Sequence, residues 1–287
     1  MAGTVLFPGA MNDFLLYNDK FYKTETLLVG ASNRGLRYGD GLFETLRYCD
    51  GKVQLADWHM ERLFDGLKLL WFDLPAYFTP GYLISQIMKL GKKNQHTSAR
   101  VRITVFRGNG GPYDPQDHFP NCIIQTWSLP EHGFELNENG LVAGIYRNAK
   151  KSMDSFSNLK TNNYLPYLMA ALQAKKERWD DAFVLNTAER ICDATIANVF
   201  AVKNGTIYTC PLQEGCIAGI MRRFLLERLP INNFSIEEKA ISEEDLLAAD
   251  EVFLTNAIKG IRWVRQCGAA RYSNQLTKAV FNKLFKK

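Results

Sequence analysis

Residues 157–165 carry the lysine on which the fold assignment turns, in the order Ser157-Asn158-Leu159-Lys160-Thr161-Asn162-Asn163-Tyr164-Leu165. This polar stretch runs directly into a predicted helix, and in most proteins such a lysine is a solvated turn residue. A lysine that forms an imine must instead lie in a pocket where its amine can be neutral, which burial and neighbouring positive charge promote. Whether Lys160 is such a nucleophile depends on its neighbours along the chain.

Three short segments downstream of Lys160 could hold an anionic ring cofactor. Asp193 follows a strand-like stretch and precedes Asn198 by five residues. An exposed loop acid is the commoner reading, but a carboxylate is also what keeps a pyridine nitrogen protonated. Gly219 opens a predicted helix, whose first N–H groups could receive a phosphate. The stretch Thr255-Asn256-Ala257 ends a strand and is either a second phosphate contact or a simple turn former.

Arg107 ends a predicted strand just before the glycine-rich turn Gly108-Asn109-Gly110-Gly111. Its guanidinium could bind a substrate carboxylate in a bidentate way, although a surface arginine at a strand end is an equally good reading. The sequence has no GxGxxG after a strand, no GxxxxGK[ST], no HExxH and no GxSxG. Nicotinamide, nucleotide-triphosphate, zincin and serine-hydrolase chemistry therefore lose support.

The apolar patterns predict two mixed α/β domains, a smaller one over 1–129 and a larger one over 134–287, with a connection at 130–133. We expect strand character from Thr26 to about Val53, and Asp57 as a possible N-cap of the following helix. Further elements are predicted by periodicity and by turn residues. The predicted helices cover 57–70, 80–92, 165–178, 219–229, 243–248 and 276–286, and the predicted strands 42–48, 99–107, 122–129, 182–186, 198–202 and 251–255.

Composition excludes several classes of protein. The chain has 287 residues, 46% of them hydrophobic, and a net charge of +5 that suits an anionic small-molecule substrate. Six scattered cysteines without a CxxC pair and four histidines indicate neither a disulfide framework nor a metal site. With no leader-like N-terminus, no apolar span and no nucleic-acid module, we expect a cytoplasmic protein that binds neither membrane nor nucleic acid.

Taken together, the order and spacing of these signals resemble the fold-type IV pyridoxal-5′-phosphate (PLP) enzymes, the class IV aminotransferase family. The stretch Asn33 to Thr45 looks like the family's N-terminal signature, and His59-Met60-Glu61-Arg62-Leu63 like its His-x-x-Arg-Leu helix. The acid five residues before Asn198-Val199-Phe200 is usually Glu in the family, whereas here it is Asp193. The resemblance covers nearly the whole chain and implies PLP as cofactor and a homodimer.

The resemblance also implies a role for each matching residue. Lys160 would carry the cofactor as an imine and move protons, with Tyr164 beside the cofactor. Asp193 would pair with the pyridine nitrogen. The cofactor phosphate would be bound by Arg62, by the cup of Gly219, Ile220 and Met221, and by Asn256. Arg107 would bind the substrate.

Within the family, the sequence leans toward the 4-amino-4-deoxychorismate lyases, which release p-aminobenzoate and pyruvate. Three stretches resemble the lyase form: Gly219-Ile220-Met221-Arg222-Arg223-Phe224, the turn after Arg107, and Asn256-Ala257, where the aminotransferases tend to have a hydroxyl residue. An aminotransferase acting on branched-chain or D-amino acids is the alternative. A PLP-free binding module is the non-enzyme rival, which the joint presence of Lys160, Arg62 and the cup opposes.

Overall fold

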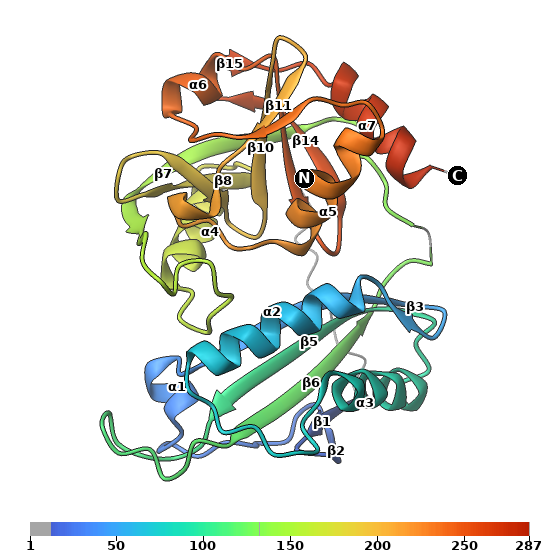
Figure 1. Cartoon of the computed structure of the whole chain (residues 1–287), viewed down its shortest axis with the longest axis vertical. Coiled ribbons are helices and arrows are strands. Elements are labelled where there is room, and N and C mark those ends of the chain that lie inside the picture. The colour runs from blue at the N-terminus through green and yellow to red at the C-terminus, as the bar shows by residue number, and fades with distance from the viewer. Residues whose placement is uncertain (1–12, 132, 287) are drawn as a thin grey trace. The chain divides into compact units, whose positions relative to one another are not determined.

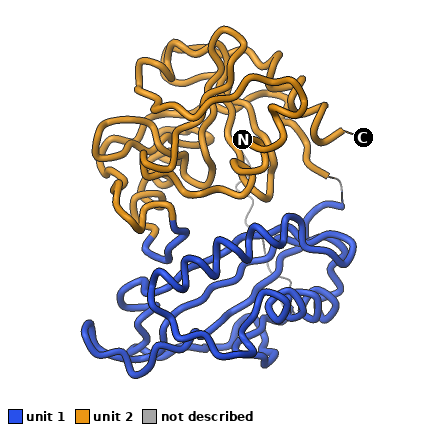
Figure 2. The backbone as a smooth tube through the Cα atoms, in the orientation of Figure 1, with its two compact units in different colours: residues 1–131, 159–163 blue, residues 132–158, 164–287 orange. Residues whose placement is uncertain are grey.

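The computed structural model describes residues 13–131 and 133–286. Residues 1–12 of the expected first domain, His132 in the expected connection and Lys287 lie outside the described residues. The described chain forms two compact units (Figure 2). Unit 1 takes in the described residues up to Glu131 together with Leu159–Asn163, and unit 2 takes in the rest.

Unit 1 is an antiparallel sheet with two long helices on one face (Figure 1). The strand order is β2-β1-β6-β5-β3-β4, and every neighbouring pair is antiparallel. Apolar residues of the helices and the strands form one core, which places both helices on the same face. The strands are β1 (Phe14–Tyr17), β2 (Lys20–Lys23), β3 (Gly41–Cys49), β4 (Lys52–Val53), β5 (Ser98–Arg107) and β6 (Pro120–Ser128), and the helices α1 (Arg34–Tyr38), α2 (Ala56–Leu69) and α3 (Pro80–Lys93).

Unit 2 is a larger sheet covered by helices, with strand order β12-β11-β10-β13-β14-β7-β8-β9 and β15 paired to β14. Parallel pairs join β14 to β7, β7 to β8 and β11 to β12, whereas its other pairs are antiparallel. The strands are β7 (Leu141–Lys151), β8 (Asp181–Asn186), β9 (Ile191–Ala194), β10 (Asn198–Lys203), β11 (Thr206–Thr209), β12 (Ile236–Glu238), β13 (Glu251–Asn256), β14 (Gly260–Cys267) and β15 (Ala270–Arg271). The helices are α4 (Leu165–Lys176), η1 (Leu212–Glu214), α5 (Ile220–Ile231), α6 (Glu243–Leu247) and α7 (Gln275–Phe285).

The mixed α/β class predicted from the sequence is confirmed, and so are most of the predicted elements. Two local predictions are wrong. Of the stretch expected to have strand character, 26–53, residues 26–32 lie in no strand and 34–38 form the short helix α1, capped by the Asn33 side chain. Asp57 lies inside the first turn of α2, and the N-cap position is Leu55, which has a positive φ of 52° and makes no side-chain cap.

The segment 159–163 belongs to unit 1 although the chain on both sides of it belongs to unit 2. Backbone hydrogen bonds to β3 explain this placement. The Phe43 N–H donates to the Lys160 carbonyl at 2.9 Å, and the Asn162 N–H donates to the Gly41 carbonyl at 2.9 Å. A domain boundary at 130–133 alone does not account for this return of the chain.

Candidate active site

Lys160 lies beside β3 in unit 1. Its backbone is fixed by the pairing with β3, and its ammonium lies 4.4 Å from the centroid of the Phe43 ring. The side chain is half-buried, and its positive charge contributes to the electrostatics of the neighbouring His59. The structure therefore places this lysine against an aromatic ring of β3 and within electrostatic range of His59.

A buried carboxylate organises the helix next to Lys160. Glu44 on β3 is 1% exposed and accepts two hydrogen bonds from Arg62 on α2, from Nε at 2.7 Å and from Nη2 at 2.6 Å. The Nδ1 atom of His59, one turn earlier on α2, lies 2.7 Å from the same carboxylate. Glu44 thus fixes the orientation of both side chains of the His-x-x-Arg pair.

The charges of this cluster follow from its burial. Burial pushes the pKa of Glu44 upward, but the Arg62 charge and the hydrogen bonds from His59 and Arg62 bring that pKa down to about 2. The pKa of His59 is lowered, first by burial and then by the charges of Arg62 and Lys160. At neutral pH the cluster therefore combines a carboxylate, a guanidinium and a neutral imidazole.

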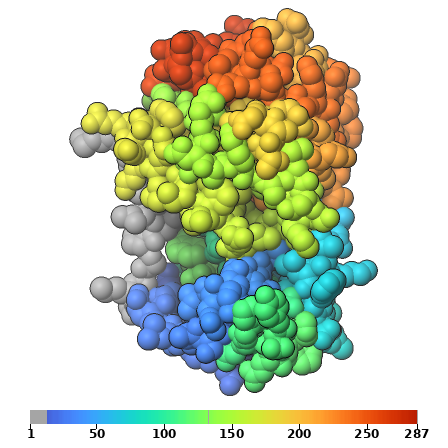
Figure 3. Space-filling view, turned by 90° about the vertical axis from the view of Figure 1, so that its left-hand side faces the viewer, coloured from blue at the N-terminus to red at the C-terminus, as the bar shows by residue number. Residues whose placement is uncertain are grey.

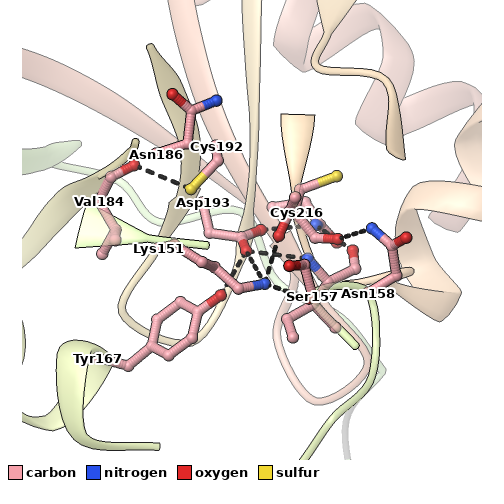
Figure 4. Close-up of polar contacts among 12 residues, drawn as sticks. Lys151, Ser157, Asn158, Tyr167, Val184, Asn186, Cys192, Asp193 and Cys216 are labelled. Atoms are coloured by element: carbon pink, nitrogen blue, oxygen red, sulfur yellow. Dashed lines mark hydrogen bonds and ion pairs between the residues drawn. The ribbon is translucent and has the colours of Figure 1, made fainter. Parts of the chain in front are cut away.

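A second buried carboxylate stands in unit 2. Asp193 lies within β9, not after a strand as the sequence had indicated, and is 1% exposed. Its Oδ2 accepts from the Tyr167 hydroxyl at 2.6 Å and from the Ile217 N–H at 2.9 Å, while Oδ1 accepts from Asn198 Nδ2 at 2.9 Å. The ammonium of Lys151 lies 3.7 Å from Oδ2 (Figure 4). The acid is thus embedded in donors from four different segments.

Two stacked tyrosines lie on α4 and just before it. The rings of Tyr164 and Tyr167 have centroids 4.4 Å apart, and the Tyr164 hydroxyl donates to the Thr195 carbonyl at 3.0 Å. Burial and the Asp193 charge raise the pKa of Tyr167 well above its ordinary value. Tyr167 therefore stays a neutral phenol that donates to Asp193.

The N-terminus of α5 has features that suit an anion-binding site. Its N-cap is Gly219, which offers no side-chain cap to the first N–H groups of the helix, and such groups have no acceptor within the helix. A Cβ on Gly219 would come within 1.8 Å of Asn198 Oδ1, so any larger residue there would displace the Asn198 amide. Ile220 and Met221 are buried behind this turn. These features and the buried Asp193 fit a phosphorylated pyridine, because the turn suits the phosphate and the acid suits the ring nitrogen.

The two remaining predicted residues are engaged with the protein itself. Arg107 is 6% exposed, and its guanidinium contacts Asp40 at 3.3 Å, His118 Nδ1 at 2.9 Å and the Leu70 carbonyl at 2.5 Å. Asn256 ends β13, and its Oδ1 accepts from the N–H groups of Ile258 and Lys259. Substrate binding by Arg107 would have to compete with these contacts.

The sequence predictions missed Lys151 and Tyr167. Lys151 ends a strand next to a second lysine, and nothing in that pattern separates the buried ammonium from its exposed neighbour. Tyr167 stands one helical turn after Tyr164, a spacing that places both side chains on one face. That spacing was the available signal for Tyr167.

Comparison with known proteins identifies the family. The model of the amino-transferase class IV family matches residues 41–267. The chain is 29% identical over 273 residues to a putative branched-chain-amino-acid aminotransferase of Methanocaldococcus jannaschii, covering 94% of this chain and 93% of that protein. It is 29% identical over 235 residues to an aminodeoxychorismate lyase of Vibrio harveyi, covering 81% and 85%. The solved branched-chain amino acid aminotransferase of Escherichia coli superposes with a TM-score of 0.84 at 24% identity, covering 94% and 92%.

The chain belongs to the class IV aminotransferase family, and its fold is the fold-type IV of these PLP enzymes. PLP is accordingly its cofactor, as the sequence predicted. Relatives of both reaction types match at similar identity, so membership defines an enzyme of the PLP-dependent class without choosing between lyase and aminotransferase. Among the described residues no helix is long and apolar enough to cross a membrane.

Proposed function

We propose that this chain is a PLP-dependent 4-amino-4-deoxychorismate lyase, which releases p-aminobenzoate and pyruvate and so serves folate biosynthesis. The observation that carries the lyase branch is the end of β13, where Asn256 is followed by Ala257, a residue without a hydroxyl. The relative from Vibrio harveyi, which is named a lyase, supports the same branch.

When bound, PLP supplies an electron sink conjugated to the amine of the substrate. Lys160 would hold the cofactor, and its free amine would take the proton from the substrate ring carbon that bears the amine. Asp193 keeps the proton on the pyridine nitrogen. The bond between the ring carbon and the enolpyruvyl oxygen would then break, which makes the ring aromatic. The enolpyruvate that leaves would take up a proton to become pyruvate, and the ring would be released as p-aminobenzoate.

The proposed binding roles are given for each unit by itself. In unit 2, the N–H groups at Gly219, Ile220 and Met221 receive the phosphate, Asn256 supports that turn, and Tyr164 lies beside the cofactor. In unit 1, Arg62 binds the phosphate in the orientation that Glu44 fixes, and Arg107 takes a carboxylate of the substrate.

The assay that decides the branch offers purified holoenzyme aminodeoxychorismate and, separately, leucine, valine and D-alanine with 2-oxoglutarate. We expect p-aminobenzoate and pyruvate in equal amounts, with no build-up of the amine form of the cofactor. Keto acid formed from an amino acid at enzymatic rates, without p-aminobenzoate, would instead establish the aminotransferase. The relative from Methanocaldococcus jannaschii is the observation that favours this second candidate.

The role of Arg107 is tested against Arg102 on the same strand. We expect Arg107→Ala to raise KM for aminodeoxychorismate about tenfold, which is ~1.4 kcal/mol of binding free energy, while PLP affinity changes little. Arg102→Ala, whose guanidinium lies over the Phe43 ring at 3.9 Å, is the matched control and should leave KM close to that of the wild type. An unchanged KM in Arg107→Ala would mean that its contacts to Asp40 and His118 are its whole role.

We also propose a homodimer, and an exposed apolar stripe on α4 supports it. Leu165, Leu168, Met169 and Leu172 follow the spacing of one helix face and are 42–61% exposed. Such a face on a single chain indicates a protein contact. Figure 3 looks onto a side of the molecule where yellow-green atoms of this part of the chain lie at the surface. Leu168→Glu should convert the dimer to monomer in sedimentation, whereas Gln173→Glu on the same helix should not.

A further inference from the structure

Lys151, the last residue of β7, is a lysine buried inside unit 2. It is 8% exposed, whereas its neighbour Lys150 makes a surface ion pair with Glu189 at 2.6 Å. Burying an ammonium is costly unless charge and hydrogen bonds compensate for the lost water. Lys151 has both kinds of compensation, since it pairs with Asp193 and donates to the carbonyls of Ser157 and Gly215 (Figure 4).

The three partners of Lys151 lie on three different segments. Asp193 is on β9, Ser157 is in the turn that leads to Lys160, and Gly215 is in the loop that leads to α5. The Gly215 backbone has a positive φ of 82°, and a Cβ there would come within 2.4 Å of the Ser152 carbonyl. One side chain therefore ties the acid to the two loops that flank it.

The donors around Asp193 are unevenly distributed over its two oxygens. Tyr167, the Ile217 N–H and the Lys151 ammonium converge on Oδ2, whereas Oδ1 accepts from Asn198. The same Asn198 Nδ2 also donates to the Ile217 carbonyl at 2.8 Å, two residues before the glycine that begins α5. The carboxylate is thus anchored through Oδ2, and the loop before the helix is anchored to the carboxylate.

The geometry points to Lys151 as a positioning residue for Asp193, which holds this carboxylate charged and fixed before the cofactor binds. A buried carboxylate without a cation would be costly, and the 3.7 Å pair offsets that cost in the apoprotein. The family usually has Glu at this position, and Asp193 has the shorter side chain. The ion pair with Lys151 holds the Asp193 carboxylate in one position, which is how the shorter acid can take the same role. This inference rests on the proposed role of Asp193 at the ring nitrogen.

A double-mutant cycle tests whether Lys151 acts through Asp193. The variants are Lys151→Met, Asp193→Asn and the double variant, with Lys150→Met as the matched control on the same strand. The measurements are the dissociation constant for PLP and urea unfolding of the apoprotein. We expect Lys151→Met to weaken PLP binding about tenfold or more and Lys150→Met to change it less than about twofold, since tenfold corresponds to ~1.4 kcal/mol.

In the Asp193→Asn background, we expect Lys151→Met to have little further effect on either measurement. Equal effects in both backgrounds would overturn the proposal, because Lys151 would then act through Ser157 and Gly215. If Lys151→Met does not fold, folding of the double variant supports the proposal, and its failure to fold overturns it.

The two readouts separate this inference from the proposed function. If Asp193→Asn alone keeps the wild-type PLP affinity and turnover, the role of Asp193 at the ring nitrogen fails. The coupling between Lys151 and Asp193 is then still read from unfolding of the apoprotein, which involves no cofactor. If unfolding shows no coupling between Lys151 and Asp193, Lys151 is not a positioning residue for Asp193, whichever reaction the enzyme catalyses.

Discussion

Glu44 of unit 1 and Asp193 of unit 2 are both buried carboxylates, and their surroundings differ. In unit 1, the Glu44 carboxylate is bound by two nitrogens of Arg62 and by His59 Nδ1, each within 2.7 Å of a carboxylate oxygen. In unit 2, Asp193 is held mainly by neutral donors, and its cation, Lys151, stands 3.7 Å away. Both acids therefore have a cation beside them, but Arg62 hydrogen-bonds Glu44 directly, whereas the Lys151 ammonium lies farther from Asp193.

This difference gives the two acids different roles: Glu44 is a scaffolding acid, which orients neighbouring side chains, whereas Asp193 is suited to a role in the reaction. A carboxylate in a bidentate arginine pair has few free acceptor sites for a third partner, and its main effect is to orient the arginine. A carboxylate fixed by hydroxyl, amide and N–H donors stays an acceptor for a protonated ring nitrogen. The comparison makes distinct predictions for the two units.

The largest effect is expected from the lysine of unit 1. Lys160→Ala should lose the visible absorbance of the covalently held cofactor and lower kcat by at least about 10²–10⁴-fold, the usual contribution of a positioned proton carrier. PLP should still bind through its phosphate. Absorbance spectra and steady-state assays measure both effects, with Lys150→Ala as the control.

Peptide mapping after borohydride reduction makes the assignment sharper. The wild-type enzyme should be labelled at Lys160. Labelling of Lys151, the buried lysine of unit 2, would reverse the roles given to the two lysines.

Removing the scaffolding acid should cost stability. Glu44→Gln breaks a buried pair and leaves the Arg62 charge without its carboxylate, which is expected to cost about 3–5 kcal/mol of unfolding free energy at pH 7. Urea unfolding of the apoprotein measures it. Glu61→Gln, an exposed change on the same helix as Arg62, serves as the control.

The pH dependence of that loss has a definite sign. The folded pKa of Glu44, about 2, lies below the ordinary 4.5, so its stabilisation is present above pH 4.5 and disappears as the pH falls toward 2. The stability gap between wild type and Glu44→Gln should therefore narrow by roughly 3 kcal/mol between pH 5 and pH 2. A gap that widened in acid would contradict the ionised pair.

The acid of unit 2 should matter for turnover more than for folding. Asp193→Asn keeps the shape and removes the charge, so the ring nitrogen loses a charge-assisted hydrogen bond of ~1.5–3 kcal/mol, and kcat should fall about 10–150-fold. Asp181→Asn changes another buried carboxylate, on β8, that accepts from Thr195. It should affect stability but leave the cofactor spectrum unchanged. Equal losses of kcat in both variants would remove the distinction between them.

The sequence was sufficient for much of the fold because its signals are local. The alternation along Ser98–Arg107 and the helical spacing along Pro80–Lys93 are properties of consecutive residues, and the structure confirms both elements. The glycine that begins α5 was also visible, since a missing side chain is itself a signal. The Leu55 N-cap of α2 was not, because a leucine with positive φ has no composition cue.

The site could be predicted only where a resemblance supplied the long-range information. The pairing of 159–163 with β3 joins segments more than a hundred residues apart, which no periodicity reveals. Lys151 shows the limit most clearly. Two adjacent lysines have the same propensities, and only the packing of β7 decides that one is buried against Asp193 and the other pairs with a surface glutamate.

The smallest expected effect compares the two stacked tyrosines and tests whether Asp193 is charged in the apoprotein. Tyr167→Phe removes a 2.6 Å hydrogen bond to a carboxylate, whereas Tyr164→Phe removes a 3.0 Å bond to a backbone carbonyl. Bonds to charged groups are worth about 1.5–3 kcal/mol and neutral ones about 0.5–1.5 kcal/mol, so Tyr167→Phe should lower the unfolding free energy by about 1 kcal/mol more. The rings and their stacking stay, which makes each variant the control of the other. Urea unfolding of both apoproteins at pH 7 measures the difference. Equal losses of unfolding free energy in the two variants would indicate that Asp193 is a neutral acid when it accepts the Tyr167 hydrogen bond in the apoprotein. The contrast drawn between the two buried carboxylates would then be wrong.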